Sequence, residues 1–181
     1  GDFGMALQFA TPAPPVVVGR LGATLQLVSV ALLFAFVFGV AAGIVAALRK
    51  DRLPGFVRSA LAVAGQSMPS FWLGILLIQL FALNLKWLPT SGTGGLDHLI
   101  LPAVTLATFL LPNAINPVLS FLGLQMGRLV GGSIITETIF AWPGIGSLMI
   151  RSIFQRDVPV VIAAVFIVSI AIVLANLIVD I

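Results

Sequence analysis

Long apolar runs without a charge constrain this chain more than any other feature. Leu25–Leu48 contains 24 residues and no charged side chain, and Val158–Val179 is a second such run near the end. A helix needs about 20 apolar residues to cross the roughly 30 Å hydrocarbon core of a bilayer. Only 8% of the 181 residues are charged, whereas a soluble domain carries about a quarter. The sequence therefore predicts an all-α, polytopic transmembrane helix bundle.

The charged residues orient the predicted bundle. Four of the nine basic residues fall in the short connection Arg49–Arg58, which the positive-inside rule places in the cytoplasm. The five predicted spans are Leu25–Leu48, Ser59–Leu85, Leu99–Leu111, Pro117–Phe140 and Val158–Val179. Connections 86–98 and 141–157 are then external. Residues 1–22 are rich in Pro and Gly and are expected to form a water-facing lead-in with a short interfacial turn of helix.

One predicted span is too short. Leu99–Leu111 has 13 residues, about 20 Å of helix, and runs into Pro112 and then a further apolar segment without a charged loop. Two interpretations compete: a re-entrant hairpin, or residues absent from the chain near Leu111/Pro112. We favour the second, because a cytoplasmic connection is needed there and no basic residue is present.

A polar, helix-breaking stretch, Gly131–Gly146, joins the last two spans. The predicted span Pro117–Phe140 includes the first part of this stretch. If it is a helix with about 100° per residue, one face about 80° wide carries Gln125, Arg128, Gly132 and Thr136. We predict this face to line a translocation pathway, with an inter-helix hydrogen-bonding seam as the alternative. The prediction is strongest for Arg128, because a charge is costly in lipid.

The second half of the stretch is expected to be structural. Glu137 lies about 180° from Arg128, so the two cannot pair within one straight helix. We predict that Glu137 accepts hydrogen bonds from backbone donors of an outer re-entry formed by Trp142, Pro143 and Gly144. Gly144 and Gly146 are expected to allow a sharp turn, and Ser147–Phe154 to form a short half-helix.

Two further polar residues are pathway candidates. Gln66 and Ser70 share a face beside Pro69, which is expected to kink the second span.

The sequence contains no catalytic triad, no metalloprotease-type histidine motif and no phosphate-binding glycine loop. The lone His98 makes a poor metal site. We therefore expect no catalytic residues and no metal or cofactor site in this chain.

Five collinear motifs resemble one family. They are Gly1-Asp-Phe-Gly4, Met68-Pro-Ser-Phe-Trp-Leu-Gly74, Trp87-Leu-Pro-Thr-Ser-Gly92, His98-Leu-Ile-Leu-Pro102, and Gly131–Gly146 with its Glu137-Thr and Trp142-Pro-Gly. Together they are similar to the membrane-spanning permease subunit of peptide/nickel-type ABC importers, the dipeptide- and oligopeptide-permease B class. The resemblance covers essentially the whole chain.

The resemblance implies a set of partners. They are a homologous second permease subunit, two cytoplasmic subunits that bind ATP and Mg, and an extracytoplasmic substrate-binding protein received by the external loops. The membrane would be the bacterial or archaeal cytoplasmic (inner) membrane. The substrate would be a dipeptide, oligopeptide, glutathione, nickel chelate or related solute.

Two parts of the family pattern are missing. An additional first span and a cytoplasmic coupling loop with a Glu-Ala-Ala pattern, expected near Leu111/Pro112, are absent. Residues 1–181 are accordingly expected to be a single permease domain with further residues before Gly1, near Leu111/Pro112 and after Ile181. The rival hypotheses from the residues alone are a self-contained channel or ion-coupled carrier, and, less favoured, a membrane enzyme.

Overall fold

The described part of the chain is almost entirely helical. In a computed structural model, residues 3–48, 69–108 and 131–179 are described. The elements are β1 (Met5–Ala6), β2 (Thr11–Pro12), α1 (Ala13–Leu48), α3 (Ser70–Leu77), η1 (Ile78–Asn84), α4 (Asp97–Ala107), a helix over 131–139, α6 (Ile145–Phe154) and α7 (Val158–Val179). The predicted all-helical class is confirmed, apart from one two-residue antiparallel pair, β1 with β2.

Helix α1 is longer than predicted. It is continuous over 36 residues, so residues 13–22 form a long helical start where only a short turn of helix was predicted. The physical reason is that Pro14 and Pro15 lie in the first turn, where a missing N–H costs no intrahelical hydrogen bond. Two helices within the described ranges, Ala13–Ala41 and Val158–Leu177, are long and apolar enough to cross a membrane. The other predicted spans fall partly outside those ranges.

The described part of the second predicted span begins at Pro69, so the kink predicted at this proline stays a prediction. Pro69 has an extended backbone (φ −63°, ψ 130°) and α3 begins at the next residue. Helix α3 continues into η1, a π-helix that no sequence signal indicated. After the end of η1 the chain changes direction at Lys86, whose φ is +56°. The Trp87 ring then packs at a tilt against the Phe81 ring, with ring centroids 6.1 Å apart.

Helix α4 is a short, buried helix. Its 11 residues are fewer than the 13 predicted, and Leu99, Ala103 and Leu106 pack with α1 in a cluster that includes Trp142. The junction Leu111/Pro112 lies outside the described residues, so both interpretations of it stay open.

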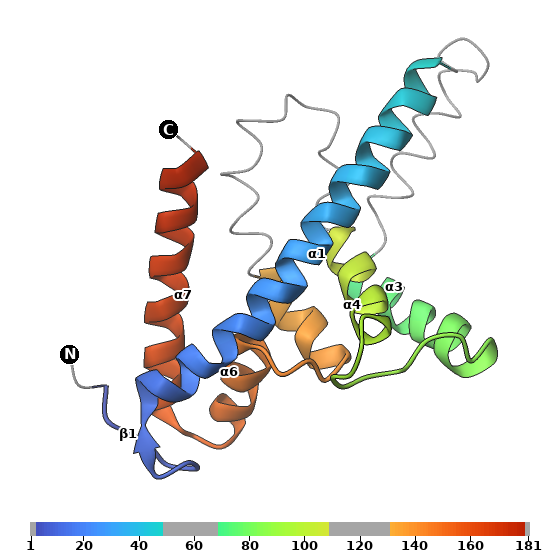
Figure 1. Cartoon of the computed structure of the whole chain (residues 1–181). Helices are drawn as coiled ribbons and strands as arrows, with labels where there is room; N and C mark the ends of the chain where they lie inside the picture. The colour runs from blue at the N-terminus through green and yellow to red at the C-terminus, as the bar shows by residue number, and fades with distance from the viewer. Residues whose placement is uncertain (1–2, 49–68, 109–130, 180–181) are drawn as a thin grey trace.

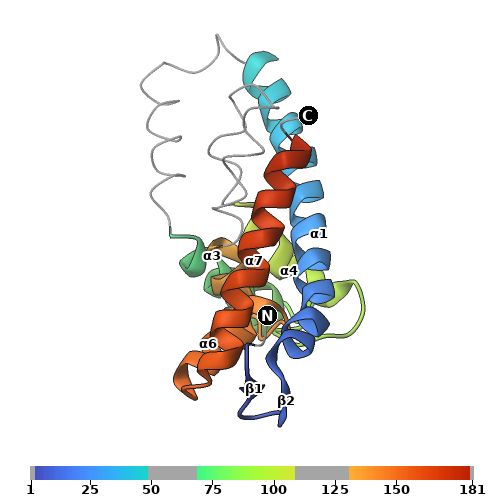
Figure 2. The ribbon, with the colours of Figure 1, turned by 90° about the vertical axis from the view of Figure 1, so that its left-hand side faces the viewer.

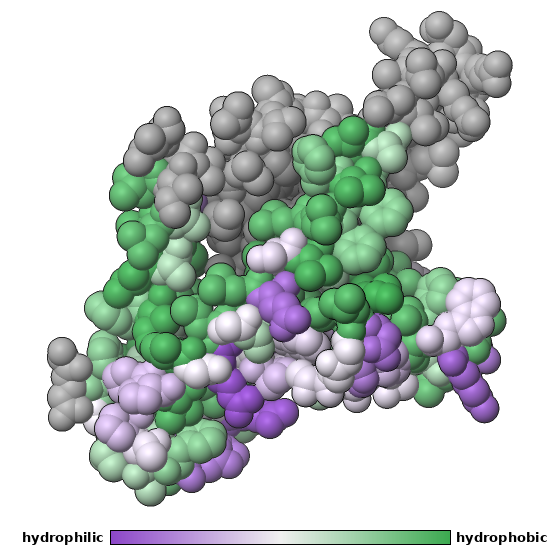
Figure 3. Space-filling view, viewed as in Figure 1, coloured by the Kyte–Doolittle hydropathy of each residue, from purple (hydrophilic) through white to green (hydrophobic). Residues whose placement is uncertain are grey.

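Helix α1 packs against α4, α6 and α7, and α3 packs against α4. The first turns of α1 pack on α6 and α7 through a cluster that contains Val17, Leu148 and Val160. Figures 1 and 2 show α1 and α7 side by side near the hairpin end, diverging toward the other end in Figure 1. Polar surface gathers along the lower part of Figure 3, while α1 and α7 above it are apolar. This arrangement places the polar end of the bundle around α6 and the hairpin.

Candidate functional site

The stretch after residue 131 folds as a helix, a tight turn and a second helix. Helix 131–139 ends with Ala141 at φ +49°, and the Trp142 N–H donates to the Glu137 carbonyl at 2.8 Å. This is the six-to-one hydrogen bond of a Schellman motif, formed here with alanine in the left-handed position that glycine usually occupies. Helix α6 begins at Ile145 after Gly144. The chain therefore reverses within five residues.

The Glu137 carboxylate is the centre of the turn. Its side chain is 0% exposed. Oε1 accepts from the Thr24 hydroxyl at 2.8 Å, and Oε2 accepts from the Ser147 N–H at 3.0 Å. The Gly146 N–H also donates to the carboxylate. Free N–H groups and the positive end of the helix dipole favour an acid at the start of α6, so Glu137 caps this helix from another segment.

Two contacts tie the turn to α1. The Thr24 hydroxyl donates to Glu137 and also accepts from the Ile145 N–H at 2.9 Å, so one side chain serves both partners. The Trp142 Nε1–H donates to the Ala23 carbonyl at 2.8 Å. We call Thr24, Glu137, Trp142 and Ser147 the Glu137 junction. It joins α1, helix 131–139 and α6 at one point.

The two glycines after the turn are required for space. Gly144 has φ −92° and ψ −175°, an extended backbone that any residue adopts. A Cβ on Gly144 would overlap the Glu137 carboxylate, and one on Gly146 would lie 2.6 Å from the Ile134 Cα. The predicted sharp turn is present, and the two glycines contribute space to it rather than an unusual backbone conformation. They allow the close approach of α6 to helix 131–139.

The remaining residues predicted to form the outer re-entry lie in the same turn. Trp142 is buried and Pro143 is half-buried between Trp142 and Gly144. The Ser147 hydroxyl donates to the Trp142 carbonyl at 2.7 Å, closing the turn from inside. The half-helix predicted at Ser147–Phe154 is present and begins two residues earlier.

The predicted pathway residues are divided by the structure. Gln66, Gln125 and Arg128 lie outside the described residues. Ser70 is the first residue of α3. Gly132 and Thr136 are both buried inside this subunit, and within the described part of the chain the Thr136 Oγ1 has no hydrogen-bond partner. Neither residue lies on an exposed wall of the subunit, and the Thr136 hydroxyl gives no support to the predicted hydrogen-bonding seam, so the role of this face stays a prediction.

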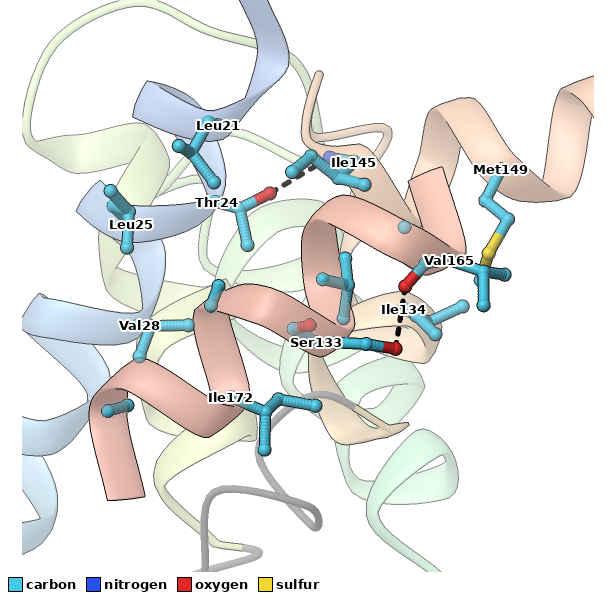
Figure 4. A pocket seen from close by; sticks show the side chains of 15 residues that line it. Leu21, Thr24, Leu25, Val28, Ser133, Ile134, Ile145, Met149, Val165 and Ile172 are labelled. Carbon is cyan, nitrogen blue, oxygen red and sulfur yellow. Dashed lines mark hydrogen bonds between the residues drawn. The ribbon is translucent and has the colours of Figure 1, made fainter. Parts of the chain in front are cut away.

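A cavity of about 320 Å³ lies beside the junction (Figure 4). Its walls come from α1, helix 131–139, α6 and α7, and are mainly aliphatic. Three hydroxyls reach it, from Thr24, Ser133 and Ser169. Thr24 is engaged at the junction, Ser169 donates to the Val165 carbonyl at 2.8 Å, and Ser133 is also bonded. The lining therefore offers apolar contact and no free polar group for a charged solute.

Thr24, Ala23 and Ser147 were not identified from the sequence. Thr24 stands immediately before the first predicted span, and its partner Glu137 is 113 residues away. A single hydroxyl residue beside an apolar run forms no periodic pattern, so the sequence does not indicate that Thr24 contacts Glu137. Within the described ranges, no group of three His, Cys, Asp or Glu could hold a metal ion.

Comparison with known proteins gives a consistent result. A family model described as "Binding-protein-dependent transport system inner membrane component" matches residues 108–181. The glutathione transport system permease protein GsiC of Escherichia coli (strain K12) is 36% identical, over all of this chain and 72% of its own length. The proteins of that name from Shigella dysenteriae serotype 1 (strain Sd197) and Shigella boydii serotype 4 (strain Sb227) match to the same extent.

Proposed function

Because this chain belongs to the family of membrane-embedded permease subunits of binding-protein-dependent ABC importers, we propose that it forms half of a translocation pathway for a small peptide-like solute. The observation that carries the proposal is the 36% identity, across the entire chain, to the glutathione transport system permease protein GsiC of Escherichia coli (strain K12). Glutathione and short peptides share a backbone amide, a free amine and carboxylates. A solute of that chemistry is the substrate class we propose.

The driving force would come from other subunits. The proposed complex contains a homologous second permease, two cytoplasmic subunits that bind ATP and Mg, and an extracytoplasmic binding protein. The match to the relatives extends over 220 positions, 39 more than the 181 residues of the chain. A coupling loop of several tens of residues near Leu111/Pro112 would account for such a difference, and it would dock on the ATP-binding subunits.

The Glu137 junction has a mechanical role in this proposal. It links α1 to α6 and helix 131–139 through three partly buried hydrogen bonds, which are stronger than bonds fully exposed to water. The outer ends of these three elements would consequently move as one body when the outer gate opens and closes. The connections 86–98 and 141–157 are the proposed receiving surface for the binding protein.

Arg128 is the residue we propose to test first for a pathway role. Arg128→Leu should leave assembly intact and reduce uptake. Thr136→Val is the matched control, because Thr136 is fully buried with an unpartnered hydroxyl, and its replacement should leave uptake unchanged. Loss of folding in Arg128→Leu, with normal uptake by the surviving protein, would contradict the pathway assignment.

The proposed function is tested by copurification. The complex, carrying the coupling loop, would be purified in lipid and its ATP hydrolysis measured with the binding protein empty and then loaded with glutathione or di- and tripeptides. Stimulation by the loaded form alone is the expected result. Failure of any ATP-binding subunit to copurify would refute the importer assignment, whereas hydrolysis stimulated only by another solute would refute the substrate class alone.

A further inference from the structure

The corner between α6 and α7 is unusually apolar and basic for an external connection. Phe154 is 83% exposed, and Ile153 and Val158 are more than half exposed beside it. Arg151 and Arg156 are exposed on the same connection. Neither arginine forms an ion pair with any residue in the described ranges. Exposed aromatic and aliphatic side chains next to exposed arginines fit a partner that is both apolar and anionic.

The geometry of this corner is fixed by short-range hydrogen bonds. The Asp157 N–H donates to the Ser152 carbonyl at 2.8 Å, and the Val158 N–H donates to the Arg156 carbonyl at 3.0 Å. Arg156 has φ +57°, so the chain leaves α6 through a left-handed residue and enters α7 at once. Asp157 also accepts from the Gln8 N–H at 3.4 Å, which joins the corner to the β1–β2 hairpin.

The length of α7 sets the depth of the corner in the bilayer. Its 22 residues give about 33 Å of helix, and the hydrocarbon core is about 30 Å thick. Helix α7 therefore has almost no length to spare, and Val158 must lie at the outer boundary of the core. Phe154 precedes Val158 by one tight turn. It must lie at the level where acyl chains meet headgroups.

We propose that the α6–α7 corner is a phospholipid-binding anchor in the outer leaflet. Ile153, Phe154 and Val158 insert at the acyl boundary, and Arg151 and Arg156 bind lipid phosphate. Aromatic side chains favour this interface, and arginine reaches phosphate while its methylene stem stays in an apolar environment. Anionic lipids are preferred over zwitterionic ones because the corner carries two exposed arginines. The proposal narrows the receiving surface for the binding protein to connection 86–98 and the earlier part of 141–157.

The test uses the absence of cysteine from all 181 residues. A spin label would be attached at Phe154→Cys in the complete complex, with partner subunits made cysteine-free, in nanodiscs of phosphatidylcholine and phosphatidylglycerol. Leu96→Cys is the matched control, because Leu96 is a large apolar residue 78% exposed on the other external connection. Accessibility to oxygen and to a water-soluble nickel chelate would be compared at both positions.

The spin label at position 154 should be relaxed mainly by oxygen, which concentrates in the lipid. The spin label at position 96 should be relaxed mainly by the water-soluble nickel chelate. Adding loaded binding protein should reduce accessibility at position 96 and leave position 154 unchanged. Dominant nickel accessibility at position 154 would overturn the proposal, as would protection of position 154 by the binding protein or by the second permease.

The arginines are tested separately, since Phe154→Cys reports only depth. Arg151→Gln and Arg156→Gln should each lower the affinity of the complex for phosphatidylglycerol by about fivefold. The measurement is the number of phosphatidylglycerol molecules that stay bound to the purified complex in native mass spectrometry. Lys86→Gln, a cation at the other external connection, is the control and should change retention less. Equal retention by the parent and both arginine variants would refute phosphate binding at this corner.

Discussion

Removing the carboxylate of Glu137 is the sharpest test of the junction. In Glu137→Ala the Ser147 N–H, the Gly146 N–H and the Thr24 hydroxyl lose their acceptor. A buried donor without a partner costs about 1–3 kcal/mol, so the two N–H groups and the hydroxyl together predict a loss of about 3–9 kcal/mol. That is a large share of the stability of a typical domain, roughly 5–15 kcal/mol.

Glu137→Gln separates charge from shape. The amide oxygen can still accept from the α6 N–H groups, and the amide nitrogen can donate to the Thr24 hydroxyl. Hydrogen bonds to a charged acceptor are worth about 1 kcal/mol more than neutral ones, so we expect a loss of about 1–3 kcal/mol. The order of stability should be Glu, then Gln, then Ala.

The measurement is the thermal midpoint of unfolding of the purified complex, which is monitored by fluorescence-detected size exclusion. Glu137→Ala should lower it by roughly 6 °C or more, taking about 2–4 °C per kcal/mol. Asp97→Ala is the control: Asp97 is an exposed acid in the first turn of α4, so its loss should cost less than about 1 kcal/mol. Equal midpoints for the two alanine variants would refute the account of the junction.

Three further substitutions test the same region, each by the thermal midpoint of the complex. Thr24→Val removes the donor to Glu137 and the acceptor of the Ile145 N–H and should cost about 2–4 kcal/mol, whereas Thr24→Ser should restore most of it; equal midpoints would contradict the bridging role. Gly146→Ala, with its Cβ meeting the Ile134 backbone, should destabilise by more than about 2 kcal/mol, while Gly22→Ala in open space on α1 should stabilise by about 0.5–1 kcal/mol; the reverse order would show that space is not the constraint. Trp142→Phe should cost about 1–2 kcal/mol through the lost bond to Ala23, and Trp87→Phe, at a side chain 70% exposed, should cost little; similar costs would argue against that bond.

Hydropathy predicted the long helices because lipid imposes their length. Val158–Val179 is predicted and found with the same bounds. At α1 the prolines suggested a break, but a first-turn proline does not interrupt a helix. The start of α1 was therefore misplaced although its apolar part was identified.

Helix ends were the harder part, because two of them lack the expected glycine. The left-handed residues that end helix 131–139 and α6 are Ala141 and Arg156. The neighbouring Gly144 and Gly146 serve close packing instead. A sequence pattern cannot distinguish these two uses of glycine, since the second depends on which side chain lies opposite.

The structural part of the site could be predicted further than the pathway. Glu137 was expected to bond backbone donors of the re-entry, because a buried acid must find donors wherever its own helix offers none. Its link to Thr24 could not be foreseen, since it depends on how α1 packs. Gly132 and Thr136 share a face with Arg128 on a helical wheel, but a wheel does not say whether that face meets water or another helix.

Uptake into proteoliposomes tests the central claim, that this chain is half of an ATP-driven importer, most directly. The complete complex would be reconstituted with ATP inside or omitted, loaded binding protein outside, and an ionophore to collapse ion gradients. The account predicts accumulation of labelled glutathione or a short peptide that requires internal ATP and the binding protein and survives the ionophore. Accumulation without ATP that the ionophore abolishes would contradict it and identify an ion-coupled carrier.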